Sequence, residues 1–169
     1  MPRNLKIYIE FVMAGGAIVL AMALLNWTMT GPKQFLILMA LAGVASVIKL
    51  RLPGMTGTYS LNFLCVLIGV AHFTLPETLV AGFAAAVLQS VCFTKRRPTV
   101  VQILFNMANL VLSIAACFFV AQSVLSAGFD SYRYAMLAAV ASVYFVTNTV
   151  LVSGVLSLLE GKSLRVVCR

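Results

Sequence analysis

The chain has 169 residues, of which 62% are hydrophobic and 9% are charged, and its formal net charge is +8. A water-soluble domain is about half apolar and a quarter charged, so this composition excludes a soluble fold and makes lipid the expected solvent. Nucleic-acid binding is also disfavoured, because the basic residues form short clusters between apolar runs and make no basic stripe with interleaved aromatic residues.

Six apolar runs predict six transmembrane helices, since a spanning helix needs about 20 mostly apolar residues. In chain order the predicted spans are residues 7–27, 35–50, 59–73, 77–93, 99–125 and 132–159. The third and fourth are short, and the third reaches full length only if part of the polar break before it is helical or if the pair is tilted or partly re-entrant. The expected fold is all-α: a polytopic membrane protein with one domain, residues 1–169, folded as a compact bundle of six transmembrane helices.

The basic residues segregate when six spans are assumed. The N-terminus, the second and fourth connections and the tail then share one side, which carries Arg3, Lys6, Lys49, Arg51, Lys95, Arg96, Arg97, Lys162, Arg165 and Arg169. The other side carries only Lys33 and Arg133. The positive-inside rule therefore predicts a multi-pass protein of the cell inner (plasma) membrane with both termini in the cytoplasm, residues 160–169 forming a cytoplasmic tail.

Polar residues recur on one helical face of the fifth span. Gln102, Asn106, Asn109 and Ser113 are spaced by four, three and four residues, which places them on one side of a helix. One interpretation is inter-helix hydrogen bonding, worth about 0.6 kcal/mol per contact; the other is the polar wall of a small-ligand pocket. The residues proposed to complete this wall are Tyr144 and Asn148 in the sixth span, Gln89 in the fourth and Asn62 in the third.

A polar, glycine-rich break, LRLPGMTGTYSLNF, interrupts the apolar sequence at residues 50–63. Pro53 and Gly54 end the preceding helix. The hydroxyls of Thr56, Thr58 and Ser60 can satisfy freed backbone groups or cap the next helix. A turn needs only about two to eight residues, so the break is more typical of a re-entrant or binding segment. The candidate ligand-binding residues are thus Thr56, Thr58, Ser60, Asn62, Gln89, Gln102, Asn106, Asn109, Tyr144 and Asn148.

Catalytic and metal chemistry are not expected. Glu10, an acid within the first span, is a functional candidate by default, but it lies one turn after Lys6 and can reach the interface beside it. The cysteines in the apolar runs are interpreted as small buried hydrophobes, and the single histidine, His72, has no second ligand type nearby. The sequence shows no nucleophile–base pair and no phosphate-binding loop, so we expect no enzyme activity, no metal and no cofactor.

Three separated motifs carry a resemblance: RLPGMTGTYSLNFL, LPETLVAG and KRRPTVVQILFNMANLVLS. Over roughly residues 35–165 the chain resembles the N-terminal multi-span membrane region of bacterial GGDEF and HD-GYP signalling proteins. The resemblance implies a membrane sensor domain or anchor that acts in signal transduction. The output domain of those proteins has no counterpart in this sequence, so their enzymatic activity does not carry over, and the chain is expected to be either a stand-alone membrane module or a truncated one.

Three functional hypotheses follow. The first is a sensory or anchoring membrane domain that binds a small ligand within the bundle and signals to a cytoplasmic domain or protein. The second is a small-solute-binding or transport subunit, which resembles the substrate-binding components of vitamin transporters in general plan only. The third is a structural or oligomerising membrane protein. The expected partners are the lipid bilayer, a cytoplasmic signalling partner and a second copy of the chain.

Overall fold

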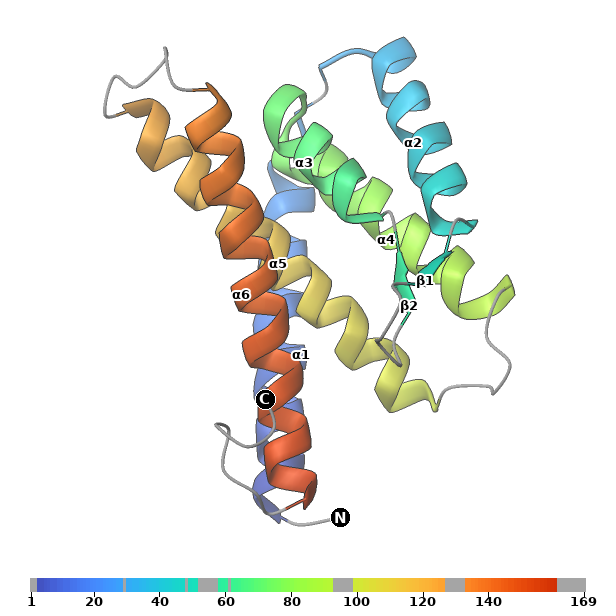
Figure 1. Ribbon diagram of the computed structural model, residues 1–169, viewed down its shortest axis with the longest axis vertical. Helices are drawn as coiled ribbons and strands as arrows, with labels where there is room; N and C mark the ends of the chain where they lie inside the picture. Colours follow the sequence, from blue (N-terminus) through green and yellow to red (C-terminus); the bar gives the residue numbers. More distant parts are fainter. Residues whose placement is uncertain are drawn as a thin grey trace.

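The computed structural model describes residues 3–28, 30–47, 49–51, 58–60, 62–92, 99–126 and 133–160. These residues form six helices and one short hairpin (Figure 1). The helices are α1 Arg3–Leu25, α2 Pro32–Val47, α3 Asn62–His72, α4 Leu75–Cys92, α5 Val100–Ser126 and α6 Arg133–Glu160, and the strands are β1 Lys49–Arg51 and β2 Thr58–Ser60. The prediction of six apolar helices is confirmed.

The hairpin corrects the prediction at the polar break. The expected second helix reached Leu50, but α2 ends at Val47 and the chain continues as β1. The expected third helix began at Tyr59, which instead lies in β2 opposite Leu50. Thr and Tyr favour extended backbone, and the Pro-Gly sequence between the strands favours a reversal. The break is therefore not a helical extension at residues 58–60, and α3 is only 11 residues long.

Three helices are long and apolar enough to cross a membrane. The stretches are Arg3–Leu25, Val100–Val124 and Tyr134–Leu159, with mean hydropathies of 2.1, 2.2 and 1.9. At 1.5 Å per residue each is about 35 Å long or more, which exceeds a hydrocarbon core of about 30 Å. The apolar parts of the others, Pro32–Ser46, Phe63–His72 and Leu75–Gln89, are shorter than a usual span, so length alone does not assign α2, α3 and α4 as crossings.

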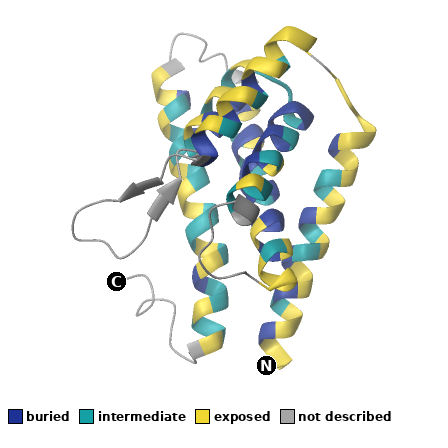
Figure 2. Cartoon of the chain, turned by 90° about the vertical axis from the view of Figure 1, so that its right-hand side faces the viewer, coloured by how far each residue is buried: buried dark blue, intermediate teal, exposed yellow. Residues whose placement is uncertain are grey.

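Exposed positions run along the described helices (Figure 2), and many of them carry large apolar side chains. Phe11 on α1 is 78% exposed and Phe119 on α5 is 74% exposed. Exposed patches of this kind are disfavoured in water and mark contact with lipid or protein. The distribution of apolar residues therefore agrees with a membrane location.

Helix α5 is the centre of the packing. It contacts α6, α1, α4 and α3, while α2 packs on α3 and α4 (Figure 1). The largest buried cluster includes Val66, Leu79, Ile114 and Val140, one from each of α3, α4, α5 and α6. Smaller clusters join α2 to α3 and α4, and α1 to α5 and α6. The helices thus share one core that runs across the bundle.

Small residues allow α1 to approach α5 closely. A Cβ atom added at Gly16 would lie 2.7 Å from the Cα and Cβ atoms of Ala108. The neighbouring Gly15 has more room, because its nearest contact would be Leu112 Cδ2 at 3.9 Å. Gly16 is therefore the position where the two backbones meet, as expected for small residues at a membrane helix interface.

The two ends of the molecule are formed by different parts of the chain. At one, which we call the terminal end, Asn4 of α1 and Leu158 of α6 line the same groove, and both described helix ends lie there (Figure 1). At the other, the connection end, the α1–α2 connection touches the α3–α4 turn, since the Thr74 hydroxyl lies 2.8 Å from the Thr28 carbonyl oxygen. Helix α1 therefore begins, and helix α6 ends, at the terminal end of the molecule.

Candidate functional site

A buried amide pair joins the two longest helices. Asn109 of α5 is 5% exposed, and its Nδ2 donates a hydrogen bond to Asn148 Oδ1 on α6. A buried amide is costly without a partner, so the bond fixes the register of α5 against α6. Of the ten predicted site residues, Asn109 and Asn148 are brought together directly.

The polar line continues one turn further along α5. Ser113 is fully buried, and neither its Oγ nor Asn109 Oδ1 has a hydrogen-bond partner among the described residues. One turn later Cys117 is also buried, and its thiol donates to the Val140 carbonyl oxygen at 3.4 Å. One side of α5 thus carries polar atoms from Asn109, Ser113 and Cys117. Helix α6 supplies the hydrogen-bond partners of Asn109 and Cys117.

Gln102 and Asn106 lie on the exposed surface of α5. Gln102 completes a capping box with Thr99: the Thr99 N–H donates to Gln102 Oε1 at 3.0 Å, and the Gln102 N–H donates to Thr99 Oγ1 at 3.4 Å. Helix α5 runs obliquely across the bundle, and its N-terminal end lies away from α6 (Figure 1). Gln102, Asn106, Asn109 and Ser113 therefore share one face of α5, as predicted. Only the part of that face with Asn109 and Ser113 is buried against other helices.

The remaining predicted residues are spread over other elements. Tyr144 packs its ring on Phe63 of α3, with ring centroids 5.4 Å apart. Gln89 is half-buried on α4. The others lie at or beside the hairpin: Thr58 and Ser60 are in β2, Asn62 is the first residue of α3, and Thr56 lies outside the described residues. Those of the ten residues whose side chains are described are therefore spread over α4, α5 and α6, and only Asn109 and Asn148 are joined by a hydrogen bond between them.

A second polar centre lies at the connection end, around Glu77. Glu77 is in the first turn of α4 and is fully buried. Thr30 donates to it twice, from its N–H to Oε1 at 2.9 Å and from its hydroxyl to Oε2 at 2.7 Å. The Thr74 N–H donates to Oε2 at 3.0 Å. We call Glu77, Thr28, Thr30 and Thr74 the Glu77 clamp.

Thr74 has two roles in the clamp. With Glu77 it forms a capping box, T-L-P-E, at the start of α4. Its hydroxyl lies 2.9 Å from Glu77 Oε2 and 2.8 Å from the Thr28 carbonyl oxygen, so its single proton is shared between the two acceptors. The clamp therefore binds the α1–α2 connection to the first turn of α4.

The electrostatics of the clamp favour an ionised Glu77. Donors from Thr74 and Thr30 surround the carboxyl oxygens of Glu77, and hydrogen bonds of this kind favour the carboxylate form. The buried acid is thus compensated by hydrogen bonds, through which it holds the two connections together.

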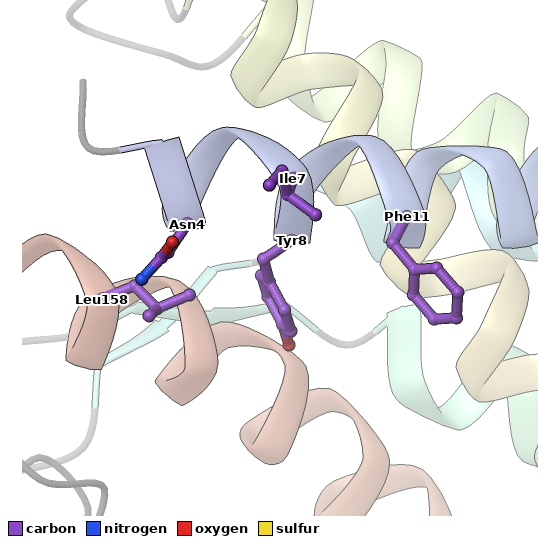
Figure 3. A pocket seen from close by; sticks show the side chains of 5 residues that line it. All are labelled: Asn4, Ile7, Tyr8, Phe11 and Leu158. Atoms are coloured by element: carbon purple, nitrogen blue, oxygen red, sulfur yellow. The ribbon is translucent and has the colours of Figure 1, made fainter.

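A shallow groove lies at the terminal end, on the outside of α1 and α6 (Figure 3). Its volume is about 400 Å³, and its lining is Asn4, Ile7, Tyr8, Phe11 and Leu158. The Tyr8 ring points toward α6 (Figure 3), where its hydroxyl donates to the Leu151 carbonyl oxygen at 3.1 Å. The mostly apolar lining suits lipid chains, and no chemistry is assigned to it.

The sequence contained a signal for part of the clamp. T-L-P-E at residues 74–77 fits the capping-box pattern of Ser or Thr followed three residues later by Glu or Gln. T-V-V-Q at residues 99–102 fits the same pattern. Nothing local marks Thr30, because its contact with Glu77 spans 47 residues.

Compared with known proteins, the chain matches no protein-family model, and no curated protein or solved structure is significantly similar to it. Within the described part of the chain, no group of three or more His, Cys, Asp or Glu residues is placed to hold a metal ion. The function is therefore inferred from the amide pair, the Glu77 clamp and the apolar surface.

Proposed function

We propose that the chain is an integral membrane domain that senses or anchors at the bacterial inner membrane and passes its state to a cytoplasmic partner. The observation that carries this proposal is the amide pair. It couples α5, which contacts four other helices, to α6, whose C-terminal end continues into the tail. A shift of α5 relative to α6 would therefore move the end of α6 that faces the proposed partner.

The proposed topology has six crossings and two cytoplasmic termini. It is supported by the apolar outer surface and by the basic residues, ten of which fall on one side when six crossings are assumed. Helices α2 and α3 are only about 24 and 16 Å long at 1.5 Å per residue, so their crossings require tilt or local thinning of the bilayer. The pairing of β1 with β2 satisfies some backbone hydrogen bonds where the helices stop.

Reporter fusions test the topology. We expect a fluorescent protein fused after Arg169 to be fluorescent and alkaline phosphatase at the same position to be inactive. Phosphatase inserted between residues 127 and 132 should be active, because that connection is proposed to lie on the outer side. An active phosphatase after Arg169 would contradict the proposal.

Matched leucine variants test signalling. Residues 1–169 are fused to a cytoplasmic reporter enzyme whose activity depends on the membrane region. Asn109→Leu should change the output severalfold, because it removes the bond to Asn148. Asn106→Leu, the same change on the exposed side of the same helix, should leave the output unchanged. Equal outputs from both variants, with both chains folded, would count against a signalling role for the amide pair.

A small-solute-binding subunit is the second candidate. It is favoured by a cavity of about 610 Å³ at the connection end, which lies within the range of about 300–1,000 Å³ typical of ligand sites. Native mass spectrometry of the purified chain tests for a bound small molecule. A stoichiometric co-purified molecule together with a fused reporter output that Asn109→Leu leaves unchanged would favour the solute-binding subunit.

A further inference from the structure

The cavity at the connection end lies between α1, the α3–α4 turn and α5. One part of its wall is apolar and comes from Val19, Met22, Ala23, Phe73, Leu75, Pro76 and Phe118. The other part carries amide and hydroxyl groups from Asn26, Thr28, Thr74 and Gln122. A mainly apolar wall with a few polar groups on one side is the usual composition of a small-molecule site.

Among the described residues, none of those that line this cavity is charged. Glu77 is close in sequence to the lining residues Thr74, Leu75 and Pro76, but it is fully buried and accepts hydrogen bonds from Thr30 and Thr74. Its charge is therefore already compensated and is not offered to a ligand. The described lining residues therefore offer a charged molecule no opposite charge, which favours uncharged ligands over ions.

The polar groups of the wall have different amounts of hydrogen-bonding capacity left. Asn26 Nδ2 already donates to the Met22 carbonyl oxygen at 2.8 Å, which leaves the carbonyl oxygen of its side chain as an acceptor. Gln122 is exposed on α5, one turn after the buried Phe118, and offers both a donor and an acceptor. A ligand with a carbonyl or hydroxyl group can satisfy these amides while its apolar part contacts Met22 and Phe118.

We propose that this cavity binds a small uncharged amphiphile that carries a carbonyl or hydroxyl group. The inference deepens the proposed function and rests on it for the membrane setting, because such molecules concentrate where helix ends meet the bilayer interface. Thr28 and Thr74 belong both to the cavity wall and to the Glu77 clamp. A bound ligand therefore touches the hydrogen bonds that join the α1–α2 connection to α4.

The chain carries an internal reporter for this cavity. Trp27 is its only tryptophan and lies between the lining residues Asn26 and Thr28. Its ring makes an edge contact with Phe35, with centroids 6.1 Å apart. Energy transfer from Trp27 to a bound fluorescent amphiphile consequently reports binding next to the cavity.

The experiment uses the full chain in lipid nanodiscs, with Prodan, an uncharged naphthyl ketone, as the probe. We expect saturable energy transfer from Trp27 to Prodan. The anionic dye 1-anilinonaphthalene-8-sulfonate should give no saturable signal. Transfer that rises linearly with probe, as in simple partition into lipid, would overturn the inference, and so would saturable binding of the anionic dye with equal or higher affinity.

Two variants locate the binding. Ala23→Leu fills the cavity and should abolish saturable transfer, whereas Ala21→Leu, the same change at an exposed position two residues earlier, should preserve it. Gln122→Leu removes an exposed lining amide without crowding the core and should weaken Prodan binding about threefold to tenfold, the value of one hydrogen bond. Wild-type binding in both Ala23→Leu and Gln122→Leu would place the probe elsewhere and refute the site.

These measurements are independent of the reporter fusions. If Prodan does not bind saturably but the termini are cytoplasmic and the output depends on Asn109, the binding site is refuted and the proposed function stands. If Prodan binds saturably but the termini lie on the outer side, the binding site stands and the proposed function is refuted.

Discussion

The terminal end and the connection end of the molecule are held together by different forces. At the terminal end, α1 packs on α5 and α6 mainly through the apolar cluster around Leu5 and Ile9, to which the Tyr8–Leu151 hydrogen bond adds. At the connection end, Thr30 and Thr74 hold one buried acid by hydrogen bonds. The comparison teaches that apolar packing dominates where α1 meets its neighbours, whereas directional bonds fix the connection that precedes α4.

Two glutamates, Glu10 and Glu77, show this difference within one residue type. Glu10, in α1, lies 3.8 Å from Lys6, and its side chain is 64% exposed. Glu77 is fully buried and is fixed by its donors. A helix start leaves N–H groups without partners, so a carboxylate there has donors available. An acid on the side of a helix has none from its own backbone.

Removing the Glu77 carboxylate should have the largest effect. Glu77→Ala removes the acceptor of the Thr30 N–H, the Thr30 hydroxyl and the Thr74 N–H, and a hydrogen bond to a charged group is worth about 1.5–3 kcal/mol. We expect a loss of about 3 kcal/mol in the free energy of unfolding, measured by circular dichroism in mixed micelles at pH 7. If Glu77→Ala lowers the unfolding free energy by less than Glu10→Ala does, the Glu77 clamp does not stabilise the fold.

Glu77→Gln sharpens this test. It keeps the shape of the side chain but replaces one acceptor oxygen by an amide NH2 group, which cannot accept a hydrogen bond from Thr30 or Thr74. We expect a smaller loss than for Glu77→Ala in the same unfolding measurement, and no loss at all would show that the second carboxylate oxygen is not needed.

Crowding the closest helix contact should have the next largest effect. Gly16→Ala forces a methyl group against the backbone of Ala108, and overpacking costs about 1–3 kcal/mol. We expect a loss of about 2 kcal/mol in the same unfolding measurement. Gly15→Ala is the matched control and should be neutral or slightly stabilising, because its methyl group meets only Leu112 at van der Waals distance. Equal losses would show that the contact is not specific to Gly16.

The hydroxyl of Tyr8 should contribute less. Tyr8→Phe keeps the ring and removes only the bond to the Leu151 carbonyl oxygen, for which we expect a loss of about 0.6 kcal/mol, the average for membrane hydrogen bonds. Tyr134→Phe, at a position 90% exposed, should not change the unfolding free energy. A Tyr8→Phe protein as stable as wild type would mean that ring packing alone holds this position.

The Lys6–Glu10 ion pair should contribute least. Both side chains are largely exposed and lie one helical turn apart, and pairs of this kind are worth about 0.3–0.5 kcal/mol. Glu10→Gln should lower the unfolding free energy by no more than about 0.5 kcal/mol, and added salt should remove even this difference. A loss comparable to that of Glu77→Gln would contradict the distinction between the two acids.

Much of the helical architecture was predictable from local composition. The apolar runs gave the six helices and placed most of their ends within a few residues. The helical period correctly put Asn109 and Ser113 on one face, and the structure buries both. Periodicity cannot show which half of a helix has a neighbour, so it gave no reason to separate Asn106 from Asn109.

The candidate sites were less predictable because they depend on contacts between distant segments. Thr30 meets Glu77 only after α2 and α3 have folded back between them. The strands β1 and β2 were missed because three extended residues leave no measurable period, and their pairing depends on the reversal that separates them. The capping boxes could have been found, since their pattern is local and was present in the sequence.

The contact between Tyr8 and Leu151 has a consequence for synthesis of the protein. These residues are 143 positions apart, so the first helix to leave the ribosome gains one of its neighbours only when the last has been made. At about 5–20 residues per second this takes roughly 7–30 s. During that interval the face of α1 around Tyr8 has no native neighbour from α6, and a nascent chain stopped before α6 would present that face to insertion factors or quality-control proteases.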